Sequence, residues 1–180
     1  SIAMGISCHA GTGGNSAIAM GESCKAHGAR SVAMGYYCGN RGDGLTTGIG
    51  SLSLGRKCVA SGQYAVATGI ESDAIGHYSV AMGNDCSAVD IATVAMGDRC
   101  TAGGTASVAM GEECVTSTNY SFACGYQCEA AGQYGFAMGN SCFSGGGFAA
   151  GIDCIASGQG TALGYNSRQY TTRGTAIGLN

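Results

Sequence analysis

One short segment, residues 79–86, recurs along the whole chain with little change. It contains Gly83, and equivalent glycines follow one another from Gly5 to Gly178, most often at an interval of fourteen. A fixed period sustained over a whole chain is typical of a repeat architecture, in which each repeat packs against its neighbours alone. We therefore interpret residues 1–180 as a single repeat domain of about thirteen coils.

The repeat has the consensus S-V-A-M-G-x-x-C-x-A-x-G-x-x, whose positions are numbered 1 to 14 from the serine. Each seven-residue half has a small residue at its third place and a glycine at its fifth. Five residues of alternating character, closed by glycine and two variable residues, predict a short strand and a tight turn. Glycine suits a turn because it accepts positive φ at no steric cost. The sequence thus predicts an all-β fold, a parallel β-roll or solenoid with two short strands in each 14-residue coil.

The spacing of the glycines is irregular at a few places. The interval from Gly35 to Gly55 is six longer than one period, and we predict a protruding loop insertion near residues 43–50. The 12-residue interval before Gly151 contains a glycine run at 145–147 and indicates a shortened turn. Solenoid ends normally carry a polar cap. Because neither end of this sequence shows one, the chain is expected to be a fragment of a longer protein.

The two faces of each strand differ in character, and alternate residues of a strand point to opposite sides. Positions 1, 3, 8 and 10 hold mainly Ser, Ala, Gly or Cys, which suit a narrow interior. Positions 2 and 4 hold bulky apolar residues, including all seven methionines, whereas positions 9 and 11 are mixed and partly charged. This pattern favours small residues inside and an apolar strip on an outer face. The rival assignment, with Val and Met inside the roll, remains open from the sequence.

A soluble chain rarely exposes a long apolar strip, so we predict that the strip is buried against copies of the same chain. Cyclic self-association would bury it without a free edge. The residues predicted at this interface are Ile2, Met4, Ile18, Met20, Val32, Met34, Leu52, Leu54, Val80, Met82, Val94, Met96, Val108, Met110, Phe122, Phe136, Met138 and Phe148.

The motif S-V-A-M-G-x-x-C-x-A-x-G resembles the head repeat of trimeric autotransporter adhesins, the YadA-like head, whose usual form is S-V-A-I-G with serine where this chain has cysteine. The match covers essentially all 180 residues. The resemblance implies a left-handed parallel β-roll, a homotrimer with the Val/Met column at its centre, and surface attachment. In viral or phage fibre proteins that reuse similar repeats, it implies a shaft or fibre. The sequence departs from the family's pattern in its cysteines and in having no coiled-coil stalk or membrane anchor within these residues.

Ten of the eleven cysteines occupy position 8, and Cys124 instead takes the place of a methionine. Residues stacked in neighbouring coils would lie about 4.8 Å apart, whereas a disulfide needs Cβ atoms about 3.8 Å apart. We therefore interpret the column as free buried thiols acting as small hydrophobes, with disulfides between coils as the alternative. The residues predicted as roll-interior thiols are Cys8, Cys24, Cys38, Cys58, Cys86, Cys100, Cys114, Cys128, Cys142 and Cys154.

Other motifs are weaker candidates. Arg41, Gly42 and Asp43 form an integrin-type tripeptide at the start of the predicted loop, where a receptor contact could be presented. Asn119 begins an N-glycosylation pattern, but its Ser121 already belongs to the repeat. Tyrosines at position 14 are expected to pad turns, with an aromatic seam for a partner as the alternative. These tyrosines are Tyr64, Tyr78, Tyr120 and Tyr134, and the histidines, which occupy different positions and are not expected to converge, are His9, His27 and His77.

The sequence predicts a non-catalytic protein, because no nucleophile–base constellation, phosphate-cradling loop or recurrent aspartate appears. No cofactor or metal is expected, the net charge of −3 argues against nucleic acid, and no segment is predicted to contact a membrane. We expect a homotrimeric fibre or adhesin head at an extracellular, cell or virion surface. It would bind a host-cell or matrix receptor through many weak contacts. A purely structural filament or virion fibre shaft is the alternative, and an ice-binding solenoid is disfavoured because no regular threonine column forms.

Overall fold

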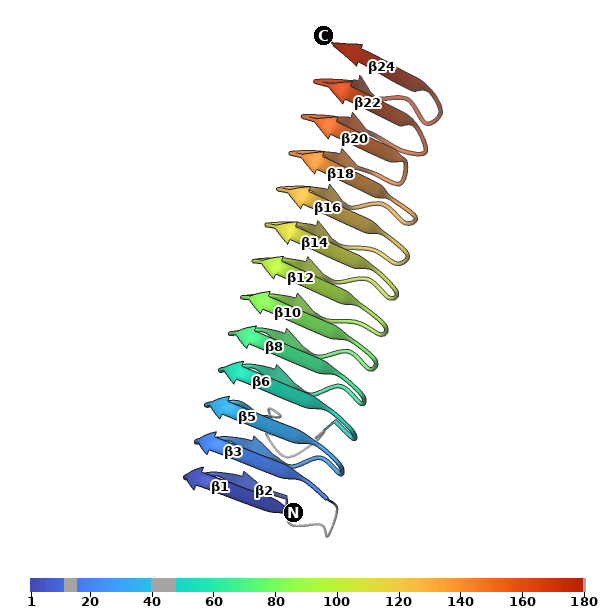
Figure 1. Ribbon diagram of the computed structural model, residues 1–180. Coiled ribbons are helices and arrows are strands. Elements are labelled where there is room, and N and C mark those ends of the chain that lie inside the picture. The colour runs from blue at the N-terminus through green and yellow to red at the C-terminus, as the bar shows by residue number, and fades with distance from the viewer. Residues whose placement is uncertain (12–15, 40–47, 180) are drawn as a thin grey trace. The chain divides into compact units, whose positions relative to one another are not determined.

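The computed structural model describes residues 1–11, 16–39 and 48–179, and these residues form strands and turns with no helix (Figure 1). The chain divides into two units, Ser1–Ala92 and Thr93–Asn180. In each unit, strands of five residues alternate with strands of two residues, and equivalent strands pair in parallel. The expected all-β parallel solenoid with fourteen-residue coils is confirmed.

In the first unit the long strands stack in the order in which they follow in the sequence. They are β1 (Ile2–Ile6), β3 (Ile18–Glu22), β5 (Val32–Tyr36), β6 (Leu52–Arg56), β8 (Val66–Ile70) and β10 (Val80–Asn84). The short strands pair in parallel behind the long ones, the first two in a sheet of their own and the other three in a further sheet. They are β2 (His9–Ala10), β4 (Lys25–Ala26), β7 (Val59–Ala60), β9 (Asp73–Ala74) and β11 (Ser87–Ala88).

The second unit repeats this arrangement. Its long strands are β12 (Val94–Asp98), β14 (Val108–Glu112), β16 (Phe122–Tyr126), β18 (Phe136–Asn140), β20 (Phe148–Ile152), β22 (Thr161–Tyr165) and β24 (Thr175–Leu179). Its short strands are β13 (Thr101–Ala102), β15 (Val115–Thr116), β17 (Glu129–Ala130), β19 (Phe143–Ser144), β21 (Ile155–Ala156) and β23 (Arg168–Gln169).

Equivalent positions of neighbouring coils pair in register. Val66 of β8 lies opposite Val80 of β10, as the 14-residue period requires. The register also holds where the coil length changes. Phe136 lies opposite Phe148 across the 12-residue interval, and β5 pairs with β6 across the longest interval. The strands therefore keep the columns of side chains aligned, and the turns absorb the differences in coil length.

The interior of each coil is filled by small side chains. Ala67, Ala95 and Ala109 at position 3 are 0% exposed, and the largest fully buried side chains are those of Thr and Cys. By contrast, Met82 and Met138 at position 4 keep 38% and 43% of their surface exposed. The rival assignment of Val and Met to the interior is therefore wrong, because the narrow space within a coil is already occupied by Ala, Ser and Cys.

Position 5 needs glycine for two physical reasons. Gly111 has a φ of +122°, and the glycines at position 5 of other coils have similar values. Side chains rarely tolerate this backbone region. A Cβ atom on Gly111 would also overlap the carbonyl oxygen of Gly125 in the next coil. Glycine at this position therefore serves the close stacking of coils as well as the turn that the sequence predicted.

The end of the predicted loop insertion is regular in structure. Gly48, Ile49 and Gly50 form the turn that leads into β6. The N–H of Ser51 donates to the Gly48 carbonyl at 3.3 Å, and the N–H of Gly50 donates to the Ala29 carbonyl of the preceding coil at 2.8 Å. Residues 48–50 of the insertion predicted at 43–50 therefore form a turn between coils, and residues 43–47 lie outside the described residues.

Candidate functional site

The outer side of the long strands carries bulky apolar residues at positions 2 and 4, and we call this surface the apolar face. The position 2 side chains, such as Val80 and Val108, are half-buried by their neighbours in the column. Several at position 4 are more open, with Met34 and Met82 at 37% and 38% exposure. The described residues predicted at the self-association interface all lie on this surface, which nothing within the described part of the chain covers.

Aromatic residues extend the apolar face in the second unit. The rings of Phe122, Phe136 and Phe148 stack with centroids 4.7 and 4.8 Å apart and nearly parallel planes. This stacking follows from the register, because identical positions of adjacent strands lie directly opposite. Cys124 stands in the same surface, between Met110 and Met138. The face is thus a set of in-register columns rather than scattered apolar side chains.

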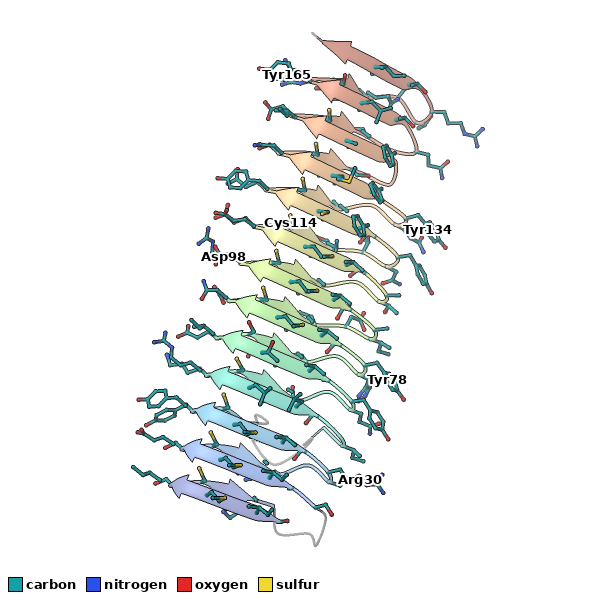
Figure 2. The ribbon with its side chains drawn as sticks, viewed as in Figure 1. Arg30, Tyr78, Asp98, Cys114, Tyr134 and Tyr165 are labelled. Atoms are coloured by element: carbon teal, nitrogen blue, oxygen red, sulfur yellow. The ribbon has the colours of Figure 1, made fainter. Side chains whose placement is uncertain are left out.

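The cysteines at position 8 form a column inside the roll. Nine of the ten are buried, Cys8 in the first coil is partly exposed, and all eleven cysteines are free. Many of these thiols point at the next coil, and Cys114 Sγ, labelled in Figure 2, donates to the Gly125 carbonyl at 3.3 Å. Ser72 occupies the same position, and its hydroxyl donates to the Gly83 carbonyl at 3.0 Å. Such thiols are therefore hydrogen-bond donors as well as small hydrophobes.

Burial favours protonated thiols in the column, whereas a hydrogen bond between two thiols raises the pKa of one partner and lowers that of the other. The hydrogen bond with Cys38 thus lowers the pKa of Cys58 to about 7. Burial raises the pKa of Cys24 from its ordinary value of 9.0. The hydrogen bond with Cys58, together with burial, raises the pKa of Cys38. Hydrogen bonds with Cys100 and Cys128, together with burial, raise the pKa of Cys114. A thiol whose pKa is raised on folding stabilises the fold below its unfolded pKa, and that contribution is lost as the pH rises above it.

We therefore expect the protein to lose stability above about pH 9 under reducing conditions. The measurement is the thermal midpoint at about pH 7 and about pH 10.5 by circular dichroism. A variant with Cys24, Cys38 and Cys114 replaced by serine is the control, because the pKa of each of these thiols is raised and Ser72 already fills this position. The variant should lose about 1 kcal/mol or less per substitution at neutral pH and show a smaller alkaline decrease. An equal alkaline decrease in both proteins would contradict the assignment to these thiols.

The position 14 tyrosines project from the turns that lead into the long strands. Tyr64 stacks on Tyr78 and Tyr120 on Tyr134, each pair with centroids 5.5 Å apart (Figure 2). All four are more than half exposed, from 51% to 66%. They therefore stack on one another along a solvent-facing edge and leave their hydroxyl ends open to a partner.

The opposite edge of the coils, at positions 6 and 7, carries many charged and polar side chains together with exposed isoleucines such as Ile70 and Ile152. Arg99 lies 2.8–3.4 Å from three carboxylates, of Asp98, Glu112 and Glu113. In the first unit, Glu71 accepts hydrogen bonds from two basic side chains at 3.0 and 3.2 Å. Exposed ion pairs of this kind are worth about 0–1 kcal/mol each. They fix side-chain positions along the edge and contribute little to the stability of the fold.

Two of the weaker predicted motifs give no site. Arg41, Gly42 and Asp43 lie outside the described residues. Within the glycosylation pattern, Asn119 Oδ1 accepts the Thr105 N–H at 3.0 Å. Its Ser121 is only 2% exposed and donates its hydroxyl hydrogen to the Thr118 carbonyl. The folded chain therefore presents this pattern to a glycosylating enzyme with its serine buried.

The histidines are arranged differently from the prediction. His9 and His27 lie with ring centroids 5.2 Å apart, so the expectation that the histidines do not converge is wrong for this pair. Position 9 of one coil and position 11 of the next share the outer side of the short-strand sheet. Burial, followed by the charges of His9 and Lys25, lowers the pKa of His27. This pair was not predicted because positions 9 and 11 become diagonal neighbours only when adjacent coils stack.

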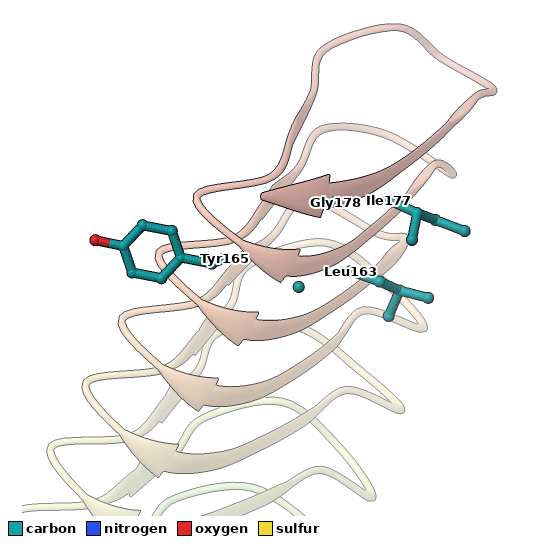
Figure 3. Close-up of a pocket in the computed structure, with 5 residues that line it drawn as sticks. Leu163, Tyr165, Ile177 and Gly178 are labelled. Carbon is teal, nitrogen blue, oxygen red and sulfur yellow. The ribbon is translucent and has the colours of Figure 1, made fainter. Parts of the chain in front are cut away.

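An open apolar hollow lies on the apolar face near the last coils. Leu163 and Ile177 border it on one side and Tyr165 on the other, with Gly164 and Gly178 as its floor (Figure 3). The hollow has no titratable pair, so its lining suits apolar contact rather than catalysis.

The described part of the chain contains neither a cluster of metal-ligating side chains nor a helix that could span a membrane. Over residues 1–11, 16–39 and 48–179, no group of three or more His, Cys, Asp or Glu side chains could hold a metal ion. Nor do these residues form a helix of the length and apolarity that crossing a membrane requires.

Comparison with known proteins gives a consistent family signal. Residues 13–37, 47–72 and 60–85 match the YadA head domain repeat. Among solved structures, the chain is similar to the collagen-binding domain of the Yersinia adhesin YadA, with a TM-score of 0.56. The sequence identity is 26%, over 74% of this chain and 68% of that one. No curated protein matches the sequence significantly.

Proposed function

We propose that the chain is a YadA-like head and acts as a non-catalytic, homotrimeric attachment head on an extracellular surface, and the repeat match and the similar Yersinia structure support this proposal. The apolar face is the observation that carries this proposal. An in-register surface of Val, Met and Phe side chains runs along the long strands of each unit, and no other described part of the chain covers it. Exposed apolar surfaces of this extent mark interaction sites.

Burial of this face against copies of the same chain is the simplest way to cover it. The partner surface is then also Val, Met and Phe, and a cyclic assembly leaves no copy with an uncovered face. Three copies per assembly is the state implied by the resemblance to YadA-like heads. The interface would hold the residues predicted from the sequence, with Phe122, Phe136 and Met138 near the middle of the second unit's apolar face.

Attachment would then use the surfaces that remain open in the trimer. The turn tyrosines and the charged side chains at positions 6 and 7 recur in every few coils and would be present on all three chains. Repeated weak contacts on linked copies give avidity well beyond that of one contact. The similar Yersinia domain is a collagen-binding domain, so we propose a matrix protein as ligand and collagen as the first candidate.

We expect the purified chain to have the mass of three copies by light scattering and to bind a collagen-coated surface saturably. Bovine serum albumin on the same surface is the negative control, and collagen denatured to gelatin tests whether the triple helix is needed. A monomeric mass would overturn the trimer. A trimer that binds no matrix protein and instead polymerises end to end would favour the structural-filament alternative over attachment.

A further inference from the structure

Three basic side chains lie together on the outer side of the short strands β2 and β4. His9 pairs directly with Lys25 across the two strands, and the His9 and His27 ring centroids are 5.2 Å apart. Lys25 and His27 are separated by one residue, so they point to the same side. All three are exposed. We call them the basic cluster.

The basic cluster has no carboxylate partner among the described residues. The ion pairs found among the described residues involve other cations, such as Arg99 and Lys57. Glu22, the one acidic residue described before β6, stands at position 6, and no described ion pair joins it to the cluster. Each member of the cluster therefore faces other cationic groups, and the pKa of His27 is lowered by burial and then by His9 and Lys25. A bound anion would relieve this repulsion.

The sequence concentrates positive charge in the coils that carry the cluster. Residues 1–60 hold five Lys or Arg and two Asp or Glu, whereas residues 61–180 hold three and nine. A protein with net charge −3 thus has one segment of net +3. Local positive potential of this kind raises the encounter rate with anionic ligands.

We propose that the basic cluster binds a sulfated polysaccharide. Sulfate groups recur along such a chain and stay ionised at all relevant pH values. The three cationic groups are separated by about 4.8 Å between coils and about 6.6 Å along the strand, so they can meet neighbouring sulfates of one extended chain. Among the described residues, β2 and β4 pair side by side and all three side chains are exposed, which suits contact with a long ligand.

This site goes beyond the proposed attachment to matrix protein and does not depend on it. The cluster lies on the short-strand sheet, whereas the apolar face lies on the long-strand sheet. Trimer formation through the apolar face would leave the cluster open, and three copies would bind one polysaccharide with avidity.

The interaction should strengthen as the pH falls. Histidine side chains gain positive charge at acidic pH. Burial, followed by the charges of His9 and Lys25, lowers the pKa of His27, so this residue gains its charge below the ordinary histidine value of about 6.5. On β2 and β4, Lys25 is the charged group that faces the two histidines, and Gly39, which bridges to Lys25 from the next coil, adds none. Binding should also weaken with salt, because surface charges are screened over about 8 Å at physiological ionic strength.

The test is elution of the full chain from immobilised heparin by a salt gradient, at about pH 5.5 and about pH 7.5. We expect retention of the native protein, stronger at the lower pH. Lys25→Ser should elute at clearly lower salt, and the triple variant His9→Ser, Lys25→Ser, His27→Ser should bind at least tenfold more weakly. Serine is compatible with position 9, where Ser87 stands in β11.

Arg168→Ser is the matched control, because Arg168 has the same position 9 in β23 and is likewise exposed. It removes one positive charge away from the cluster and should leave retention nearly unchanged. Equal losses of heparin retention for Lys25→Ser and Arg168→Ser would show that retention depends on net charge alone, and would overturn the site. Equal retention on immobilised polyglutamate would overturn a sulfated saccharide in favour of an acidic peptide. The mass of each variant by light scattering shows whether weaker retention reflects loss of this site or loss of the trimer.

Discussion

Gly111→Ala is expected to unfold the coils around it, with a loss of more than about 4 kcal/mol in the free energy of unfolding. The φ of +122° alone costs an alanine about 1–3 kcal/mol. The new Cβ would overlap the carbonyl oxygen of Gly125, which also accepts the thiol of Cys114. The two coils would have to separate, which breaks the pairing of β14 with β16. Denaturant unfolding followed by circular dichroism measures the loss.

Gly103→Ala supplies the matched control in the same unit. Gly103 has no positive φ, and an added Cβ would first meet the Thr116 carbonyl oxygen at 3.1 Å. Ala131 already stands at this position of the repeat. We expect a change within about 1 kcal/mol. Similar losses of unfolding free energy for Gly111→Ala and Gly103→Ala would show that glycine at position 5 is not required for the stacking of coils.

Met110→Glu is expected to convert the proposed trimer into folded single chains. Met110 stands on the apolar face between Met96 and Cys124, and in a cyclic trimer three introduced carboxylates would approach one another away from water. Burying an unpaired charge costs several kcal/mol per ion. Each loss of about 1.4 kcal/mol weakens association tenfold. Light scattering should show one chain instead of three, with the β-sheet signal retained.

Val115→Glu is the control for the introduced charge. Val115 lies on the short-strand sheet, directly opposite Glu129, so its position already accepts a carboxylate. This variant should remain trimeric. A trimer that survives Met110→Glu would place the self-association surface elsewhere, and a trimer lost in both variants would point to a general effect of charge.

The fold was predictable from the sequence because the period is nearly fixed. Fourteen-residue spacing, alternation within each half and glycine at position 5 together predict the coil, its two strands and its parallel stacking. The resemblance to YadA-like heads is confirmed by the repeat match and by the similar Yersinia structure. Which face of the strands lies inside was not fixed, since the phase across a turn depends on backbone angles. The positive φ at Asp85 and Arg99, neither of them a glycine, shows how little composition reveals there.

Contacts between coils were harder to predict than the coils themselves. The thiol of Cys100 donates to the Gly111 carbonyl in the next coil, a bond that can be foreseen only once the stacking distance is known. The same holds for His9 and His27, which meet diagonally. Stacking of Tyr120 on Tyr134 was nearer to prediction, because both stand at position 14.

The division of labour between strands and turns has an evolutionary consequence. Equivalent positions of neighbouring strands pair in register whatever the length of the turn. Removal or duplication of one whole repeat would therefore still leave neighbouring strands paired in register. Unequal recombination between copies of the gene segment can therefore lengthen or shorten the protein in steps of one coil. The number of coils could then change while the sequence of each coil, and with it the chemistry of its side chains, stays the same.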